Sequence, residues 1–236
     1  MAHNDYKNKY FSILGDSIST LEWYSTPDYA AYYNVERKLL SGVLCPADTW
    51  WGQVIEHFGG ELLVNNSFAG STVTWRPTYE IESYACSDER TASLHRDGTE
   101  PDVIMIFMGI NDWGYGVLPA PLDETQAGEL SVFSVAYSRM LEKIQKNYPQ
   151  AELWCLTLPI AKRSEGEDFP YCRGGVHIGA YCDVIRACAE RYGCRIADLY
   201  RYEEPYNTLD EFHPDVQGMK TLADAVIEEI GEKKNG

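Results

Sequence analysis

The sequence predicts an α/β fold in which a parallel sheet lies between two layers of helices. Short apolar runs recur between longer amphipathic stretches, a pattern typical of parallel sheets that are covered on both faces. One run is apolar throughout, which favours a strand at the centre of the sheet. No internal repeat and no linker rich in proline, glycine or serine interrupts the 236 residues, so we expect a single domain over residues 1–236.

Apolar runs at five places are the predicted strands of this sheet. Each run is short and lies between turn-forming or polar residues, as strands do. The third is the one that is apolar throughout, so it belongs in the middle of the sheet. In chain order the runs are Tyr10–Leu14, Leu62–Asn65, Val103–Met108, Leu153–Leu156 and Arg195–Ala197.

Amphipathic stretches between these runs predict the helices. The clearest is Leu130–Asn147, where apolar residues form one stripe and Pro149 ends the pattern. The segment from Pro77 to Pro101 predicts only a short helix, over Asp88–Leu94. The other predicted helices are Trp50–His57, Gly179–Tyr192 and Val216–Ile230, the last of which Pro214 opens.

The charge balance excludes several classes of partner. With 20 basic and 36 acidic side chains, the formal net charge of −16 repels nucleic acids and anionic membrane surfaces. Neutral or cationic substrates fit better. No stretch approaches the roughly 20 apolar residues that a spanning helix needs, and the polar residues 1–10 lack the apolar core of a signal peptide. We therefore expect no membrane insertion and, for the sequence as written, a cytoplasmic location, unless a leader has been removed.

The seven cysteines indicate reduced thiols rather than a disulfide framework. Their number is odd and they form no C-x-x-C pair. Cys182, Cys188 and Cys194 recur at six-residue spacing, which suits partly buried side chains on a helix better than a tetrahedral zinc site. We expect neither a metal nor another cofactor.

Two polar segments at opposite ends of the chain carry complementary chemistry. Ser17 follows the first strand at once, and open α/β sheets place their ligands at the carboxyl ends of strands. Asp210 precedes His213 by three residues in a predicted turn, so its carboxylate can hold one ring nitrogen and leave the other as a base. Serine needs such a base to act as a nucleophile. Taken singly, each segment is also compatible with an ordinary turn or helix cap.

Hydrogen-bond donors follow the second and third predicted strands. Gly70 has no side chain to keep a substrate oxygen from its backbone N–H, and Asn111 offers an amide group. Ester hydrolysis needs such donors because its tetrahedral intermediate gathers negative charge on oxygen. Either segment alone could equally be a turn.

Together these segments resemble the four signature blocks of the SGNH (GDSL-like) hydrolases, in the family's order. The blocks are Gly15-Asp16-Ser17, Gly70 after Asn66-Ser67-Phe68-Ala69, Gly109-Ile110-Asn111-Asp112, and Asp210 with His213-Pro214. The resemblance implies a flavodoxin-like, three-layer α/β/α fold with strand order 2-1-3-4-5. It implies that Ser17 attacks the substrate with help from His213 and Asp210, and that Gly70 and Asn111 join the Ser17 backbone amide in an oxyanion hole. The G-x-S-x-G elbow of α/β-hydrolases is absent.

Several further residues are expected near the reaction centre. Asp16 adjoins the serine, Trp75 follows Gly70, and Trp113 and Tyr115 follow Asn111, so these four are the predicted substrate pocket. The aromatic insertion over residues 23–33 could form a substrate wall. His177, in a glycine-rich loop, could touch a substrate or simply be exposed.

The favoured hypothesis is a serine hydrolase that cleaves small-molecule or carbohydrate esters through an acyl-enzyme. A carbohydrate O-acetylesterase fits, and a lipase, short-chain acyl esterase or thioesterase stays open. A binding module that keeps the fold without catalysis is a more remote alternative. A flavodoxin-like phosphate binder is disfavoured, because the four strand-end segments contain no lysine or arginine. The sequence leaves the oligomeric state open.

Overall fold

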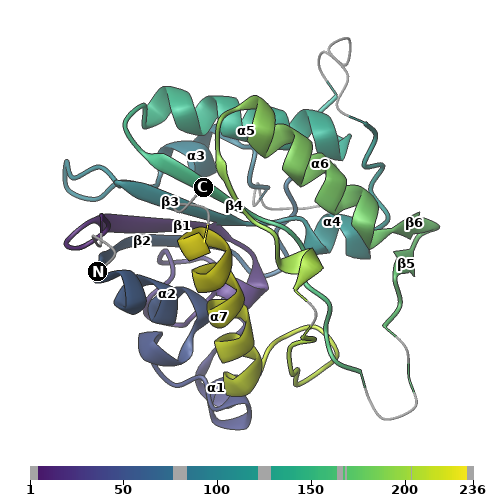
Figure 1. Cartoon of the computed structure of the whole chain (residues 1–236), viewed down its shortest axis with the longest axis horizontal. Coiled ribbons are helices and arrows are strands. Elements are labelled where there is room, and N and C mark those ends of the chain that lie inside the picture. Colours follow the sequence, from purple (N-terminus) through teal and green to yellow (C-terminus); the bar gives the residue numbers. More distant parts are fainter. Residues whose placement is uncertain are drawn as a thin grey trace.

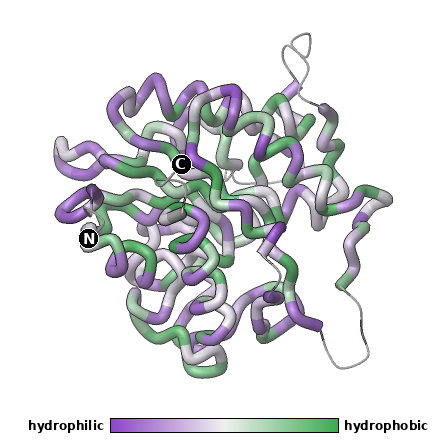
Figure 2. The backbone as a smooth tube through the Cα atoms, viewed as in Figure 1, coloured by the Kyte–Doolittle hydropathy of each residue, from purple (hydrophilic) through white to green (hydrophobic). Residues whose placement is uncertain are grey.

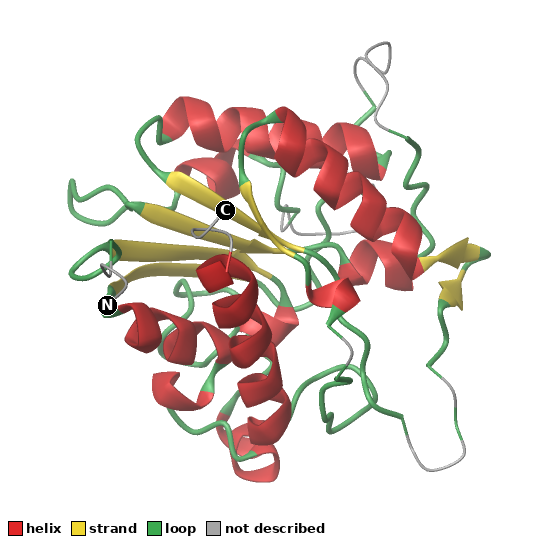
Figure 3. Cartoon of the chain, viewed as in Figure 1, coloured by secondary structure: helices red, strands yellow, loops and turns green. Residues whose placement is uncertain are grey.

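The computed structural model describes residues 5–76, 84–121, 129–163, 167, 169–202 and 204–232. Its centre is a five-stranded parallel sheet in the order β2-β1-β3-β4-β7, with helices on both sides (Figures 1 and 3). This confirms the predicted α/β class and strand order, since β7 is the fifth predicted strand. The strands are β1 (Tyr10–Gly15), β2 (Glu61–Ser67), β3 (Val103–Phe107), β4 (Glu152–Leu156) and β7 (Arg195–Ala197).

Two helical layers cover the sheet (Figure 1). One layer contains α3 (Asp88–Ala92), α5 (Phe133–Asn147) and α6 (Ile178–Arg191), and the other contains α1 (Val35–Ser41), α2 (Trp50–Phe58) and α7 (Val216–Glu232). Figure 2 shows apolar residues concentrated along the strands and polar residues on the outer helix surfaces. β3 is buried over its whole length, as expected for a central strand whose two faces are both covered.

Short elements gather where the strands end. α4 (Ile110–Gly114) follows β3, and a two-stranded hairpin of β5 (Cys172–Arg173) and β6 (Val176–His177) projects at the same side of the molecule (Figure 1). Short 3₁₀ turns cover Ser17–Ser19, Pro46–Asp48 and Leu199–Arg201. Because all five sheet strands are parallel, their carboxyl ends meet along one edge, and the loops that follow β1, β2 and β3 come together there.

Some helices differ from the sequence-based expectation. α5 begins at Phe133 rather than Leu130. The Leu130 carbonyl accepts a hydrogen bond from the Trp75 backbone N–H (2.9 Å), so the residues before Phe133 bond to the loop that follows β2 instead of starting the helix. α1 was not predicted. The Asn34 side chain caps its first turn, and Gly42 ends it in the left-handed conformation (φ 76°).

The cysteines are all free thiols, and Cys182 and Cys188 are buried on α6.

Candidate active site

The turn after β1 fixes the position of Ser17. The Asp16 carboxylate accepts a hydrogen bond from the Ile18 backbone N–H (3.0 Å) and so caps the 3₁₀ turn that starts at Ser17. Gly15 is required just before it, because a Cβ atom there would lie 2.6 Å from the Ser19 Cβ and 2.7 Å from the Ser67 Oγ. Ser17 is 7% exposed, so its hydroxyl faces a confined space at the edge of the sheet.

His213 reaches Ser17 from the loop before α7. Its Nε2 lies 2.9 Å from the Ser17 Oγ, and its Nδ1 lies 2.9 and 2.8 Å from the two Asp210 carboxylate oxygens. The Asp210 side chain also accepts the His213 backbone N–H (2.9 Å), which folds the carboxylate back over its own turn. The structure therefore brings together three side chains, from positions 17, 210 and 213, in a continuous hydrogen-bonded series.

Tyr32 joins this series from the aromatic insertion. Its hydroxyl donates to the Asp210 Oδ2 (2.5 Å), and its ring stacks on the His213 imidazole with centroids 3.4 Å apart and planes 10° apart. Burial raises the pKa of Asp210, but the hydrogen bonds from His213 and Tyr32 outweigh this effect and hold the pKa well below its usual value. Asp210 therefore stays ionised and able to orient the ring. The sequence reasoning gave Tyr32 no such role, because 178 residues separate it from Asp210.

Replacing Tyr32 with phenylalanine is expected to lower kcat for a small ester by about 10-fold, since one hydrogen bond to a charged group is lost. KM should change little, because the stacked ring remains. Steady-state kinetics on p-nitrophenyl acetate separate the two parameters. Tyr29→Phe is the matched control, since its hydroxyl bonds to Glu89 (3.3 Å) and Asn66 and not to Asp210 or His213. Equal losses in the two variants would show that Tyr32 does not position the Asp210–His213 pair.

A cavity of about 220 Å³ opens in front of Ser17 and His213. Of the residues predicted for the site, Asn111 and Tyr115 also line it, whereas Gly70, Asp16, Trp75 and Trp113 are not among its lining residues. The full lining is Ser17, Ile18, Ile110, Asn111, Gly114, Tyr115, Arg173, Phe212 and His213.

The predicted pocket residues outside the cavity have other surroundings. Asp16 is buried beneath its turn, and this burial raises its pKa to about 7. Trp113 is fully buried and stacks on Phe169 with ring centroids 5.6 Å apart, while Trp75 is 43% exposed. His177 caps the first turn of α6 by accepting the Gly179 backbone N–H, so this exposed histidine has a structural contact. The sequence reasoning placed Arg173 only in a segment, residues 173–177, that could touch a substrate or simply be exposed. It did not predict four other lining residues, which are Ile18, Ile110, Gly114 and Phe212.

Donors for a developing oxyanion lie around Ser17. The Asn111 amide donates one N–H to the Ser71 carbonyl (2.8 Å), which places Asn111 beside the Gly70–Ser71 loop and leaves its second N–H for a ligand. In the part of the chain that the structure describes, the backbone N–H groups of Ser17 and Gly70 donate to no other group. α4 sets the position of Asn111. It follows Gly109, whose φ of 124° suits glycine alone.

Two buried charged side chains hold the site loops together. The Arg90 guanidinium donates to the Gly15 carbonyl (2.9 Å), to the Asn66 side chain and carbonyl (both 2.7 Å), and to the Ser71 Oγ (2.5 Å). The Asp112 carboxylate accepts from the Val73 backbone N–H (2.8 Å) and from Thr74; burial raises the pKa of Asp112 to about 6 despite these bonds. Arg90 thus links the loops after β1 and β2, and Asp112 links the second loop to α4.

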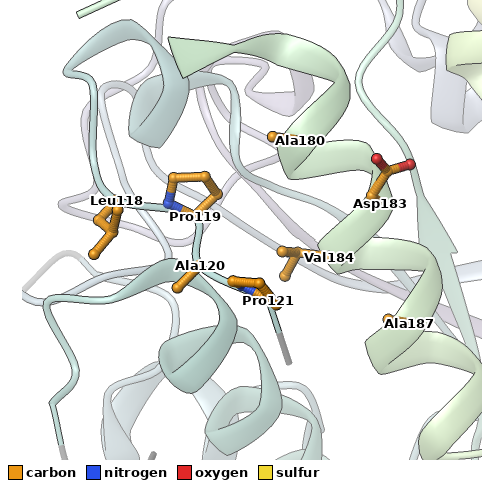
Figure 4. A pocket seen from close by; sticks show the side chains of 8 residues that line it. All are labelled: Leu118, Pro119, Ala120, Pro121, Ala180, Asp183, Val184 and Ala187. Carbon is orange, nitrogen blue, oxygen red and sulfur yellow. The ribbon is translucent and has the colours of Figure 1, made fainter. Parts of the chain in front are cut away.

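A larger cavity, of about 480 Å³, lies away from this site, between residues 118–121 and α6. Figure 4 shows prolines and small apolar side chains facing each other across it. Its described lining contains no serine, cysteine or histidine, and its one ionisable side chain, Asp183, is paired with Arg186 at 2.7 Å, so the smaller cavity is the candidate active site. Within the described ranges no cluster of histidine, cysteine or acidic side chains could hold a metal ion, and none of the described helices is long and apolar enough to cross a membrane.

Comparison with known proteins identifies the family and the fold. The sequence profile of the GDSL-like lipases and acylhydrolases matches residues 9–162. The structure is similar to that of a candidate GDSL-like lipase from Bacteroides ovatus, at 25% identity and a TM-score of 0.73, over 96% of this chain and 99% of that one. A second candidate GDSL-like lipase, from Bacteroides uniformis, has 26% identity and a TM-score of 0.71 over 95% and 96% of the two chains.

A carbohydrate esterase of family 2 from Myceliophthora fergusii shares the fold, at 15% identity and a TM-score of 0.59, over 98% of this chain and 69% of that one. A search of the curated proteins finds no match.

Proposed function

The chain belongs to the family of GDSL-like lipases and acylhydrolases, and from this premise we propose that it hydrolyses carboxylic esters through a covalent acyl-enzyme. One observation carries the proposal most directly: the Ser17 Oγ lies 2.9 Å from His213 Nε2, and Asp210 holds the opposite ring nitrogen. A serine and a base in hydrogen-bond contact, with a third group orienting the base, are what nucleophilic catalysis by serine requires.

The proposed reaction has two steps. In the first, His213 Nε2 takes the Ser17 proton while Oγ attacks the ester carbonyl, and the histidine then gives that proton to the departing alcohol. In the second, His213 takes a proton from water, which attacks the acyl-enzyme and releases the acid. The Asn111 amide and the backbone N–H groups of Ser17 and Gly70 stabilise the oxyanion in both steps. Ionised Asp210 stabilises the imidazolium that forms transiently.

The cavity supports a small acyl group. Its volume of about 220 Å³ lies below the range of roughly 300 to 1,000 Å³ that is usual for drug-sized ligands. Ile18, Ile110 and Phe212 supply apolar walls, which suit an acetyl or short alkyl chain. An acetyl ester of a sugar hydroxyl is the favoured substrate, and the carbohydrate esterase fold of a structural neighbour is compatible with it.

Labelling with a fluorophosphonate probe tests the activated serine. We expect stoichiometric labelling of the native protein and, by peptide mass spectrometry, an adduct on Ser17. Only a serine activated by a neighbouring base reacts in this way. The Ser17→Ala variant should take up no label. A native protein that resists the probe, or an adduct on another residue, would contradict the proposal and favour a binding module.

A further inference from the structure

Arg173 brings a positive charge to the candidate active site from outside the sheet. It lies on β5, in the hairpin that projects beyond the strand ends (Figure 1), and it lines the same cavity as Ser17 and His213. Its guanidinium carbon lies 4.3 Å from the ring centroid of Phe212 and 5.2 Å from that of Trp113. Since Phe212 directly precedes His213, the charge is anchored next to the proposed base.

No acidic side chain neutralises this charge within the ranges that the structure describes. The Arg173 side chain has neither an ion pair nor a hydrogen bond there, and it contacts the rings of Phe212 and Trp113. Arg163 differs in this respect, because it pairs with Glu211 at 2.6 Å. A guanidinium that is held by stacking on rings keeps its N–H donors at its edge, where they are available to a ligand.

In the part of the chain that the structure describes, the acidic side chains adjoining the lining residues in sequence are already engaged, Asp112 by Val73 and Thr74. Asp210 is held by His213 and Tyr32, Glu211 by Arg163, and Asp16 is buried under its turn. None of them lines the cavity. The cavity is therefore locally cationic, although the whole chain carries a formal charge of −16. At this one position the charge favours an anionic substrate, whereas the net charge favours neutral or cationic substrates.

We propose that Arg173 determines substrate specificity by binding a carboxylate of the ester substrate, an inference that rests on the proposed hydrolase function. The planar guanidinium matches a carboxylate with two parallel hydrogen bonds. Arg173 is the single arginine or lysine among the lining residues, which suits a monoanion better than a phosphate dianion, for which backbone nests or several cations are usual. The small cavity requires the carboxylate to lie only a few bonds from the reacting ester.

Such a carboxylate can belong to either half of the ester. If the carboxylate is on the acid half, the substrate is a monoester of a short dicarboxylic acid. If the carboxylate is on the alcohol half, the substrate is an acylated uronic acid. Two matched pairs of substrates distinguish these sources. One pair is the p-nitrophenyl monoester of glutaric acid and the corresponding ester of glutaric acid monoamide. The other is acetylated methyl glucuronide and acetylated methyl glucoside, assayed by acetate release.

The experiment compares the native protein with Arg173→Gln and Arg173→Lys on all four substrates, after subtraction of the rate without protein. In at least one pair, we expect native kcat/KM to favour the charged member by about 10-fold or more. Arg173→Gln should lower kcat/KM for that member by about 10- to 100-fold, as for lost hydrogen bonds to a charged group. It should change the neutral member by less than about threefold, and Arg173→Lys should restore part of the loss.

Arg201→Gln is the matched control, because it removes one positive charge from a side chain that is 73% exposed and outside the cavity lining. It should leave the preference intact. The proposal is overturned if neither charged substrate is preferred or turned over, or if Arg173→Gln slows charged and neutral substrates equally. Turnover of p-nitrophenyl acetate and labelling of Ser17 distinguish failure of this proposal from failure of the proposed hydrolase function. If both are observed, the hydrolase function stands and only the role of Arg173 is wrong.

Discussion

Ser17→Ala is expected to lower kcat for p-nitrophenyl acetate by at least about 10³-fold, because the covalent route disappears with the hydroxyl. The residual rate would come from the oxyanion donors, which can still act on an attack by water. Burst and steady-state kinetics with purified protein measure the change, and the burst of p-nitrophenol should vanish together with turnover. KM should change little, since the alanine keeps the shape of the cavity.

Ser19→Ala provides the control for this variant. Ser19 lies on the same turn and is fully buried, but its hydroxyl accepts a hydrogen bond from the Trp50 indole (3.2 Å) and does not line the cavity. We expect it to lower stability by about 1 kcal/mol and to retain most of the activity. If Ser17→Ala keeps native turnover, the assignment of the nucleophile is wrong.

Arg90→Met is expected to produce the largest loss of stability, about 3 to 5 kcal/mol. The Arg90 side chain is fully buried, and its removal takes away its hydrogen bonds to the carbonyls of Gly15 and Asn66 and to the side chains of Asn66 and Ser71. The Gly15 carbonyl would keep the bond from the Phe68 backbone N–H (3.1 Å). Burial lowers the pKa of Arg90 to about 10, so the side chain is still charged at neutral pH. For a chain of this length the midpoint of thermal unfolding should fall by roughly 10 °C.

Thermal unfolding followed by circular dichroism measures this loss. Arg96→Met is the control, because Arg96 is exposed, and its replacement should change stability by less than about 0.5 kcal/mol. Fluorophosphonate labelling of the folded Arg90 variant should also slow, since Arg90 connects the strand before Ser17 with the loop that carries Gly70. A variant as stable as the control would show that the buried hydrogen bonds of Arg90 contribute little.

The strands could be predicted because a strand that is buried on both faces has a run of apolar residues in the sequence. β3 is an uninterrupted apolar run and is buried throughout, and all five sheet strands overlap their predicted ranges. α1 has no comparable pattern. Its apolar residues Val35, Leu39 and Leu40 are all exposed, so they do not form a stripe that faces the core. Its ends depend on the caps at Asn34 and Gly42. α4 begins in a glycine-containing segment that is equally typical of a turn.

The site was partly predictable for a similar reason. Asp210 and His213 are three residues apart, so local geometry alone suggests their contact, and the order of the family's blocks suggested Ser17 as their partner. The contact of Tyr32 with Asp210 spans 178 residues and depends on how the insertion folds. Arg173 lies in the glycine-rich segment that also contains His177, and the sequence gives no reason to prefer it over His177 as a substrate contact. An arginine without an ion-pair partner cannot be distinguished, from the sequence alone, from an ordinary surface arginine.

The hairpin of β5 and β6 pairs only within itself in the described structure, whereas Ser17, Asn111 and His213 follow or precede elements of the main α/β framework. Changes to the hairpin therefore need not disturb the hydrogen-bonded series between Ser17 and Asp210. Through exchange of this one appendage, related proteins could diverge in the esters they accept while the reaction itself is inherited unchanged.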